Sequence, residues 1–310
     1  MDVTTMAGSV VVATLTYRRN ELLADLLPQL LDQVGRCGAP AEVLVVDNDP
    51  AGGAREVVDK HPAVRYVHEP TPGIAAARNR AMDAAGDVEG LVFIDDDEKP
   101  VGDWLAQLLL TKARTGADAV VGWVDTSYVG TLDPWIEAGE FFVRRRHPTG
   151  ATVPMAATNN LLLDLARVRA LGLRFDPDFG LTGGSDTMFT RQLVRAGGRI
   201  VWCDEAVVID PVPVDRATRR WVLRRRFRFG NGWARTSLAL ERGSTGRARV
   251  RCRLAADGLV RIAAGLAESA AGSAGRSLRH RAKGLGRAAR GLGMVAGAFG
   301  HVYTEYDRKP

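Results

Sequence analysis

Four carboxylates directly follow an apolar run in the stretch GLVFIDDDEKP, residues 90–100. Asp95, Asp96, Asp97 and Glu98 repel one another, so folding gains nothing from gathering them at one point. Divalent cations such as Mg²⁺ and Mn²⁺ prefer oxygen ligands, and Mg²⁺ is usually held by one or two carboxylates plus substrate phosphates. Side chains two residues apart on an extended segment share a face. The stretch therefore predicts a divalent-cation site, and a solvated acidic turn before the next helix is the alternative.

Apolar runs and helical patterns alternate along the first 125 residues. Runs that predict strands occupy residues 9–16, 42–49, 64–69, 90–95 and 117–124, and amphipathic segments separate them. Each run is continuous in hydrophobicity, as expected for parallel strands that are buried on both faces. The fold class predicted is α/β, with a doubly wound, mostly parallel sheet and a Rossmann-like nucleotide-binding half.

Polar residues stand where several of these predicted strands end. Ligands of such sheets bind beyond the carboxyl ends of the strands, where strand order reverses. The residues at those ends are Thr14, Thr16, Asp47, Asp95 and Asp97. The first strand is followed by TLTYRRN, so the GxGxxG and GxxxxGK[ST] phosphate loops are absent there. This disfavours a dehydrogenase and a P-loop NTPase, and it assigns phosphate charge to a cation and to arginines such as Arg78.

The second half of the chain has weaker periodicity. A strand running into a helix is predicted over 157–171, a glycine-rich loop feeding a helix over 180–198, and one or two strands over 199–210. Asp186 falls at the start of that second helix, where an acid is favourable against the helix dipole. From its position alone, Asp186 is interpreted as a residue that stabilises the start of the helix.

The ordered set of motifs resembles that of the family 2 glycosyltransferases, which have the GT-A fold, and in particular the bacterial exopolysaccharide sugar transferases. The resemblance covers about residues 9–232 and rests on the stretches VVVATLTYRRN, VLVVDND, GIAAARN, VFIDDDEKP, GADAVVGWV, TNN, FGLTGGSDTMF, WCDEAVVIDPVPVDRAT and RRFRFGN. It implies inverting, metal-dependent transfer of one sugar from a nucleotide-sugar, with a UDP-sugar favoured. The implied acceptor is a hydroxyl of a glycan or of a lipid-diphosphate-linked glycan.

The same resemblance implies roles for individual residues. Asp95 and Asp97 match the DxD motif, whose last aspartate meets Mn²⁺ or Mg²⁺ on the diphosphate, and Asp47 is expected to contact the base. Asp186 matches the general base that deprotonates the acceptor hydroxyl, for which Asp176, Asp178 and Glu205 are the alternatives. The donor-binding set implied is Thr14, Thr16, Asp47, Arg78 and Asp95.

Two positions depart from the family pattern. Ser185 replaces the glutamate of a Gly-Gly-Glu-Asp loop, and Asp210 stands where relatives often have histidine or glutamate near the metal. Asp210 is thus a third candidate metal ligand. A catalytically inactive homologue, acting as a nucleotide-sugar binding or scaffold subunit, is the alternative function, although the joint presence of Asp95, Asp97 and Asp186 disfavours it. The segment ATRRW at 217–221 lacks the glutamine of QxxRW, which favours single over processive transfer.

The charge of the chain is unevenly distributed. Lys and Arg number 20 against 30 Asp and Glu in residues 1–212, a net of −10, whereas residues 213–310 have 22 against 6, a net of +16. We expect a GT-A domain over 1–212, with a donor half at about 9–125 and an acceptor half at about 126–212. Residues 213–310 are predicted to form a basic amphipathic helical region that docks on an anionic membrane surface. A solvated helical face is the alternative, and no nucleic-acid partner is expected.

The spacing of the cysteines and the hydropathy of the chain indicate where in the cell the protein is expected. Cys37, Cys203 and Cys252 are far apart and include no CxxC pair, which disfavours a disulfide scaffold and a zinc site. The first residues lack a basic leader, and the longest apolar runs are shorter than 18 residues. We therefore expect a cytoplasmic protein, peripheral at the inner face of the membrane.

Overall fold

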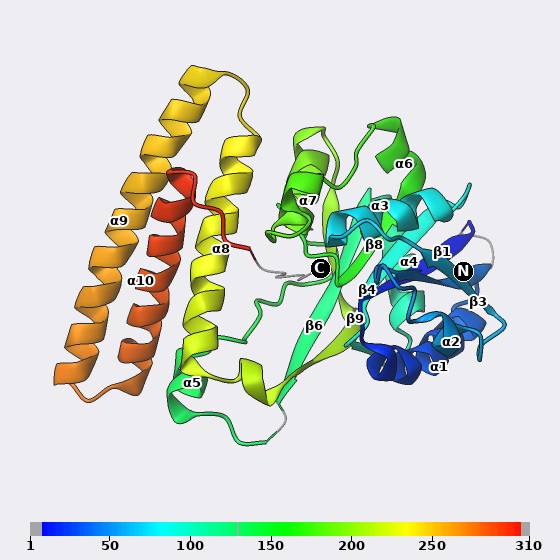
Figure 1. Ribbon diagram of the computed structural model, residues 1–310, viewed down its shortest axis with the longest axis horizontal. Helices are drawn as coiled ribbons and strands as arrows, with labels where there is room; N and C mark the ends of the chain where they lie inside the picture. The colour runs from blue at the N-terminus through cyan, green and yellow to red at the C-terminus, as the bar shows by residue number, and fades with distance from the viewer. Residues whose placement is uncertain (1–7, 129, 305–310) are drawn as a thin grey trace. The chain divides into compact units, whose positions relative to one another are not determined.

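The computed structural model describes residues 8–128 and 130–304 (Figure 1). The chain divides into two compact units, which are considered separately. The first comprises Met1–Asp125, Arg144–Leu181 and Ser185–Asp210, and the second comprises Thr126–Val143, Thr182–Gly184 and Pro211–Pro310. The domain boundary near residue 212 stays a prediction. The two units are defined by compactness and are discontinuous in sequence, so they do not test whether residues 1–212 fold as a domain.

A mixed sheet forms the first unit. The order of its strands is β3-β2-β1-β4-β8-β6-β9-β5, with β7 paired to β9. The neighbours β3, β2, β1 and β4 are parallel, whereas β8 is antiparallel to both β4 and β6. This confirms the predicted α/β class. The bounds are β1 (Val10–Thr16), β2 (Ala41–Asp47), β3 (Val64–His68), β4 (Gly90–Asp95), β5 (Lys99–Pro100), β6 (Ala119–Tyr128), β7 (Thr152–Val153), β8 (Asn160–Asp164) and β9 (Ile200–Val212).

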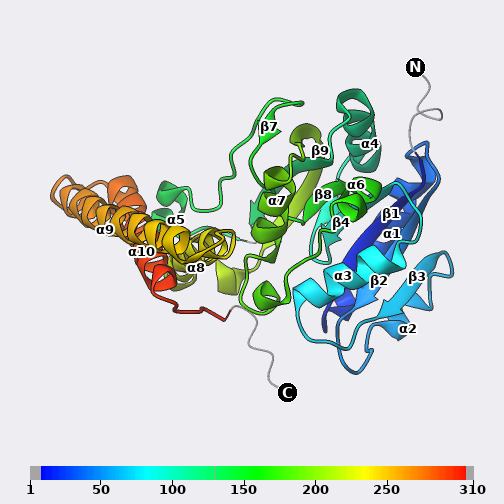
Figure 2. The same ribbon diagram turned by 90° about the horizontal axis from the view of Figure 1, so that it is seen from above.

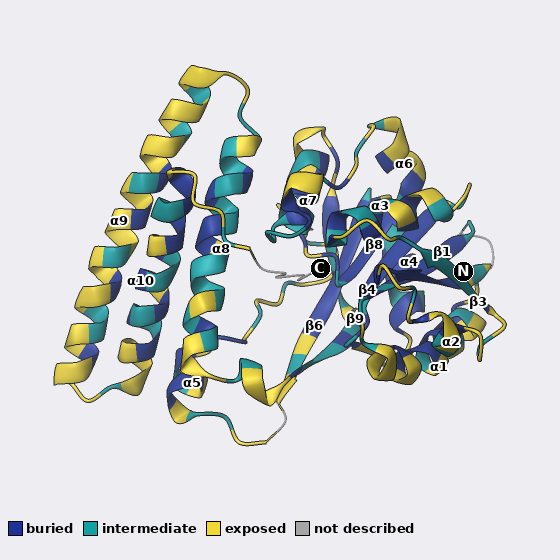
Figure 3. Ribbon diagram, in the orientation of Figure 1, coloured by how far each residue is buried: buried dark blue, intermediate teal, exposed yellow. Residues whose placement is uncertain are grey.

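Helices cover both faces of this sheet, and its strands are buried (Figure 3). Alternate residues of β1 divide between two apolar clusters, with Val10 and Val12 in one and Val11 and Ala13 in the other. Continuous apolar runs were expected to behave in this way. The helices are α1 (Asn20–Arg36), α2 (Arg55–Val58), α3 (Ile74–Ala84), α4 (Trp104–Thr115), α6 (Leu165–Ala170) and α7 (Ser185–Arg195).

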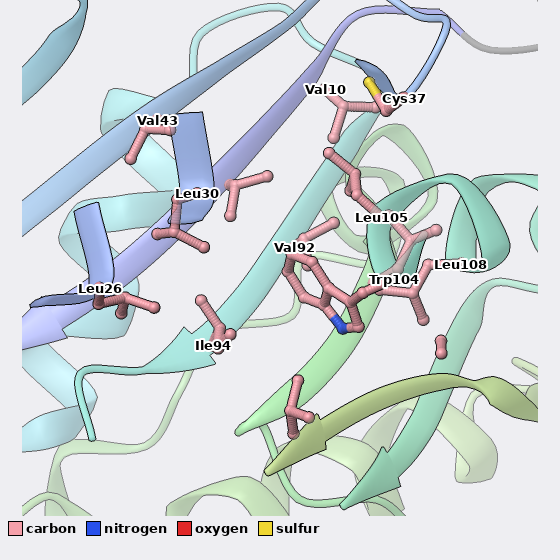
Figure 4. Close-up of a cluster of buried hydrophobic side chains, with 14 of the residues drawn as sticks. Val10, Leu26, Leu30, Cys37, Val43, Val92, Ile94, Trp104, Leu105 and Leu108 are labelled. Carbon is pink, nitrogen blue, oxygen red and sulfur yellow. The ribbon is translucent and has the colours of Figure 1, made fainter. Parts of the chain in front are cut away.

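One of the two clusters joins α1 and α4 to the sheet. Figure 4 shows Leu26 and Leu30 of α1 together with Trp104 of α4 and Ile94 of β4. The fully buried Trp104 donates its indole N–H to Asn160 Oδ1 at 2.8 Å, so burial leaves no unpaired donor. Asn160 also donates to the carbonyl oxygens of Trp123 and Ala206. These bonds tie β8 to α4, β6 and β9, and Asn160 pairs with Ile94 of β4, next to the residue where the acidic cluster begins.

The second unit consists mainly of helices, as its sequence predicted. They are α5 (Pro134–Gly139), α8 (Arg219–Ala239), α9 (Ser244–Ala274) and α10 (Leu278–Ala298). Asp133 caps α5 by accepting from the Trp135 N–H, and Pro134 occupies the first turn, where its missing N–H costs nothing. α10 packs against both α8 and α9 (Figures 1 and 2). Within the part of the chain that the structure describes, none of the helices combines the length and apolar character needed to cross a membrane.

Candidate functional site

The acidic cluster lies at the end of β4, with Arg19 as its counter-ion. Asp96 is buried, and 20% of the Asp97 side chain is exposed. Arg19, from the loop between β1 and α1, places Nη1 2.8 Å from Asp96 Oδ1 and 3.0 Å from Asp97 Oδ2. Sequence reasoning did not assign Arg19, although the pair of arginines in TLTYRRN directly after the first strand was the available signal.

One further carboxylate, that of Asp210 on β9, meets this cluster next to Glu98. β5 and β9 pair antiparallel with Lys99 beside Ile209, so the register places Glu98 opposite Asp210. Arg144 Nη2 lies 2.6 Å from Asp210 Oδ2. Asn159 donates to Glu98 Oε1, whereas the buried Glu98 Oε2 has no hydrogen-bond partner. Neither Arg144 nor Asn159 was assigned a role from sequence, because each is far along the chain from the acid that it contacts. Asn159 directly precedes β8, and Arg144 lies between α5 and β7.

Burial and mutual repulsion raise the pKa values of these acids. Burial, followed by the negative charge of Asp97, raises the pKa of Asp95 to about 7, and the guanidinium of Arg78 opposes the shift. Burial also raises the pKa of Glu98 well above its ordinary value, with the charges of Asp95 and Asp210 as further causes. Repulsion among these groups would diminish if a cation were bound among them.

The donor set suits a hard divalent cation that is shared with a substrate. In the described ranges, no group of three or more His, Cys, Asp or Glu side chains is arranged to hold a metal ion alone. Mg²⁺ sites commonly need only one or two protein carboxylates, since phosphate oxygens and water complete the coordination. Asp95 and Asp97 supply oxygen ligands of that kind, and the unpartnered oxygen of Glu98 lies in the same acidic cluster. The residues present therefore fit a cation that binds together with a diphosphate.

The strand register aligns the residues that were predicted to bind the donor. Thr16 pairs with Asp47 on β2, and Leu15 pairs with Asp95 on β4, so all lie at one edge of the sheet. Thr14 and Thr16 are both buried, and the Thr14 hydroxyl has no hydrogen-bond partner. The predicted residues at the strand ends thus share one edge, whereas their contact with a nucleotide stays a prediction.

Asp47 has a local partner for each carboxylate oxygen. Oδ1 accepts from the Asp49 N–H at 2.9 Å, and Oδ2 accepts from the Ala54 N–H at 2.8 Å and from the Tyr66 hydroxyl at 3.0 Å. Burial and the hydrogen bond to Asp47 raise the pKa of Tyr66 to about 12. Asp47 therefore shapes the loop that follows β2, and its expected contact with a base would have to coexist with these bonds.

Three phenylalanines in ring contact pack α7 against the face of the sheet that carries Asp95. The Phe189 ring of α7 stacks on Phe175 with centroids 4.1 Å apart, and Phe175 meets Phe93 of β4 edge-on at 5.9 Å. Because Phe93 and Asp95 are two residues apart on β4, their side chains point to the same face. Asp186 lies one turn before Phe189, in the first turn of α7.

Arg78 and Ser185 complete the surroundings of this stack. The guanidinium of Arg78, on α3, lies 5.4 Å from the centroid of the Phe175 ring, and its charge acts on Asp95. Ser185, which begins α7, is 1% exposed and its hydroxyl has no hydrogen-bond partner. Asp186 Oδ1 accepts from the Thr187 N–H at 2.7 Å. The aromatic stack thus links Arg78 and Asp95 with the helix that carries Asp186.

This fold and site agree with the results of comparison with known proteins. The family model described as Glycosyl transferase family 2 matches residues 9–167. The chain is 39% identical over 225 residues to the succinoglycan biosynthesis protein ExoM of Rhizobium meliloti (strain 1021), covering 71% of this chain and 72% of that protein. The chain therefore belongs to glycosyl transferase family 2, as its motifs predicted, and it is a glycosyltransferase. Its similarity to ExoM agrees with the resemblance to bacterial exopolysaccharide sugar transferases that the motifs indicated.

Solved structures agree in fold. The mannosyltransferase PcManGT from Pyrobaculum calidifontis, in complex with GDP-Man and Mn²⁺, aligns with a TM-score of 0.64 and 20% identity over 95% of this chain and 88% of that one. GalNAc-T7 with UDP, GalNAc and Mn²⁺ aligns with a TM-score of 0.54 and 13% identity over 79% of this chain and 54% of that one, about half its length. At these identities the likeness establishes the GT-A fold.

Proposed function

We propose that this glycosyltransferase moves one sugar, with inversion and with a divalent cation, from a nucleotide-sugar to a hydroxyl of a glycan or lipid-linked acceptor. A UDP-sugar is the favoured donor, and polysaccharide or glycoconjugate biosynthesis is the setting. The observation that carries the proposal is the crowding of carboxylates around the end of β4, where the pKa of Asp95 is raised to about 7. Such an arrangement of carboxylates is unfavourable without a cation. The Mn²⁺ in the complexes of PcManGT and GalNAc-T7 supports the proposed use of a divalent cation.

The proposal assigns the donor side of the reaction to the acidic cluster and its neighbours. Asp97 and Asp95 would hold Mn²⁺ or Mg²⁺, with Asp210 as a further ligand once it separates from Arg144. When bound, the cation would stabilise the charge that develops on the departing nucleoside diphosphate. Arg78 would meet the remaining diphosphate charge, and Thr14, Thr16 and Asp47 would line the nucleotide pocket.

Asp186 is the proposed general base. A carboxylate within hydrogen-bond reach assists a sugar hydroxyl, which is a poor nucleophile, by accepting its proton. The alternatives are less suited. Asp176 accepts from the Asp178 N–H and caps the short helix Pro177–Phe179. The hydrogen bond from Thr149 is the main cause of a lowered pKa at Glu205, which makes Glu205 a weaker base.

The proposed partner of the second unit is the anionic inner face of the membrane. The net charge of +16 over residues 213–310 motivates this proposal. Several arginines of α8 have an additional role in packing, because Arg225 lies over the rings of Phe142, Trp221 and Phe229. Contact with lipid headgroups therefore need not come from α8.

Release of nucleoside diphosphate from a panel of nucleotide-sugars, with Mn²⁺ and with EDTA, tests the proposed function. We expect release from one donor in Mn²⁺, stimulated by the correct acceptor and abolished by EDTA. Nucleotide-sugar binding with no release from any donor would support the inactive homologue instead. Undiminished release in EDTA would contradict the metal-dependent reaction while leaving sugar transfer intact.

A further inference from the structure

The long helices of the second unit bury their small residues and expose large apolar ones. The buried residues of α9 are Leu254, Gly258, Gly265 and Gly272. By contrast, the side chains of Leu259, Val260 and Leu266 on the same helix are 59%, 67% and 52% exposed. A helix that packs in water normally turns its large apolar side chains inward. α9 departs from this arrangement, because three of its four buried residues are glycines.

Glycine contacts account for this arrangement. A Cβ placed on Gly265 would lie 2.5 Å from the carbonyl oxygen of Gly284, and one on Gly258 would lie 2.9 Å from that of Gly291. These distances leave no room for a side chain, so α9 and α10 meet backbone to backbone. Small residues play this part where helices associate within lipid, where burying large apolar side chains brings no gain. The large apolar side chains of α9 are consequently available to an outside partner.

One face of α9 is uncharged for about six turns. Most of its members follow one another at helical spacing of three or four residues, two adjacent pairs lie between them, and all of them are exposed. At 1.5 Å per residue the face is about 33 Å long. We call it the α9 outer face, and it consists of Cys252, Ala256, Leu259, Val260, Ala263, Leu266, Ala267, Ala270 and Ala274.

Basic residues precede this face on the same helix. The first turns of α9 carry the exposed residues Arg249 and Arg253, whereas Arg247 and Arg251 donate to the carbonyl oxygens of Glu241 and Ala298. An apolar face beside clustered arginines is the combination by which a helix binds in the plane of an anionic bilayer. A second copy of this chain is a poorer occupant, because two regions of net charge +16 would repel each other.

We infer that the α9 outer face is the surface by which this enzyme inserts into the headgroup boundary of an anionic membrane. The helix would lie parallel to the bilayer, with Leu259, Val260 and Leu266 among the acyl chains and the arginines among the lipid phosphates. The inference deepens the proposed membrane partner and rests on it. It assigns apolar insertion to α9, whereas a purely electrostatic attachment would need no particular apolar residue.

Flotation of the full chain with vesicles tests the inference. The vesicles are phosphatidylcholine with 30% phosphatidylglycerol, at low and high salt, with pure phosphatidylcholine for comparison. Val260→Glu should lower the partition coefficient by about tenfold or more, because it places a charge among acyl chains. The matched control is Val214→Glu, since Val214 is 65% exposed and lies outside α9. Equal flotation of Val260→Glu and the unsubstituted enzyme would overturn the inference, as would equal losses in both variants.

A native cysteine reports insertion directly. Cys252 is exposed on the α9 outer face, whereas Cys37 and Cys203 are buried, so an environment-sensitive fluorophore can be attached selectively. Anionic vesicles should shift its emission to the blue, and an unchanged spectrum during flotation would overturn the inference. So would a dimer in solution that Val260→Glu dissociates, because the face would then belong to a second copy. Mn²⁺-dependent donor binding should be retained in Val260→Glu. This measurement does not depend on the membrane, so it separates failure of this inference from failure of the proposed reaction.

Discussion

Glu98, the residue directly before β5, lies near Asp210 of the antiparallel strand β9, next to the acids at the end of β4. Arg144 holds Asp210 at 2.6 Å, and Arg19 holds Asp97 from the other side of the cluster at 3.0 Å. Two arginines from distant parts of the sequence therefore offset a group of acids that repel one another. We propose that this group of acids forms a cation site.

Replacing Arg19 should affect the metal-free and metal-bound proteins differently. Arg19→Gln leaves the buried carboxylate of Asp96 without its partner, which should lower the free energy of unfolding by about 1–3 kcal/mol in EDTA. Mn²⁺ with UDP should then raise the melting temperature of the variant more than that of the unsubstituted enzyme, because the cation no longer competes with a guanidinium. Arg18→Gln is the control, since Arg18 is 61% exposed and pairs with Asp49 outside the cluster. Equal stabilisation of both enzymes by Mn²⁺ would argue against competition.

The stability of the metal-free protein should depend on pH through Asp95. An acid with a higher pKa in the folded than in the unfolded state favours folding below its unfolded value, here 3.8, and loses this contribution as pH rises toward about 7. The free energy of unfolding of the unsubstituted protein should therefore fall, relative to Asp95→Asn, between pH 4.5 and 8 in EDTA. Urea unfolding of both proteins across this range measures the difference. A difference that does not change with pH would show that the pKa of Asp95 is not raised.

Asp186→Asn should slow turnover by about 10²–10⁴-fold, the usual share of a general base, while donor binding persists. Asp178→Asn, in the short helix Pro177–Phe179, is the control and should change turnover little. Steady-state transfer and a separate donor-binding titration distinguish the two effects. Full activity in Asp186→Asn would require another base.

Phe189→Ala should destabilise the first unit and loosen α7. Phe189 is fully buried against Phe175, and truncating a core phenylalanine costs about 3–5 kcal/mol. Val194→Ala, at a position 37% exposed on the same helix, should cost much less. Urea unfolding compares the two variants. Similar losses would show that the aromatic stack does not anchor α7.

The strands and their carboxyl-end acids could be predicted from sequence because both are local signals. Hydrophobic runs marked β1 to β4, and acids stood at the ends of β2 and β4. The partners of Glu98 and Asp210 could not be predicted in the same way. Asn159 and Arg144 reach them only because β8 and β9 join the sheet, and no local pattern encodes that pairing.

The helices of the second unit could be predicted from sequence, but the side chains that each helix buries could not. Their helical character was evident from composition, whereas the direction of each face was not. Arg225 was expected only as part of a basic surface, but its guanidinium lies over three aromatic rings. The glycines of α9 and α10 determine which side turns inward, and this follows from close backbone contact that hydropathy does not reveal.

The most direct test of the cation site is Mn²⁺ binding, followed by electron paramagnetic resonance of the free ion, in the presence of UDP and separately of GDP. The unsubstituted enzyme should bind Mn²⁺ with one of these nucleotides, and Asp97→Asn should weaken binding by at least about tenfold through loss of a charged ligand. Asp59→Asn is the matched control, because Asp59 lies on an exposed part of the same unit with 62% of its side chain accessible. Asp97→Asn should also be at least as stable as the unsubstituted protein in EDTA, since it removes one repelling carboxylate. Equal Mn²⁺ affinity in Asp97→Asn and the unsubstituted enzyme would contradict the assignment of this acidic cluster as the metal site.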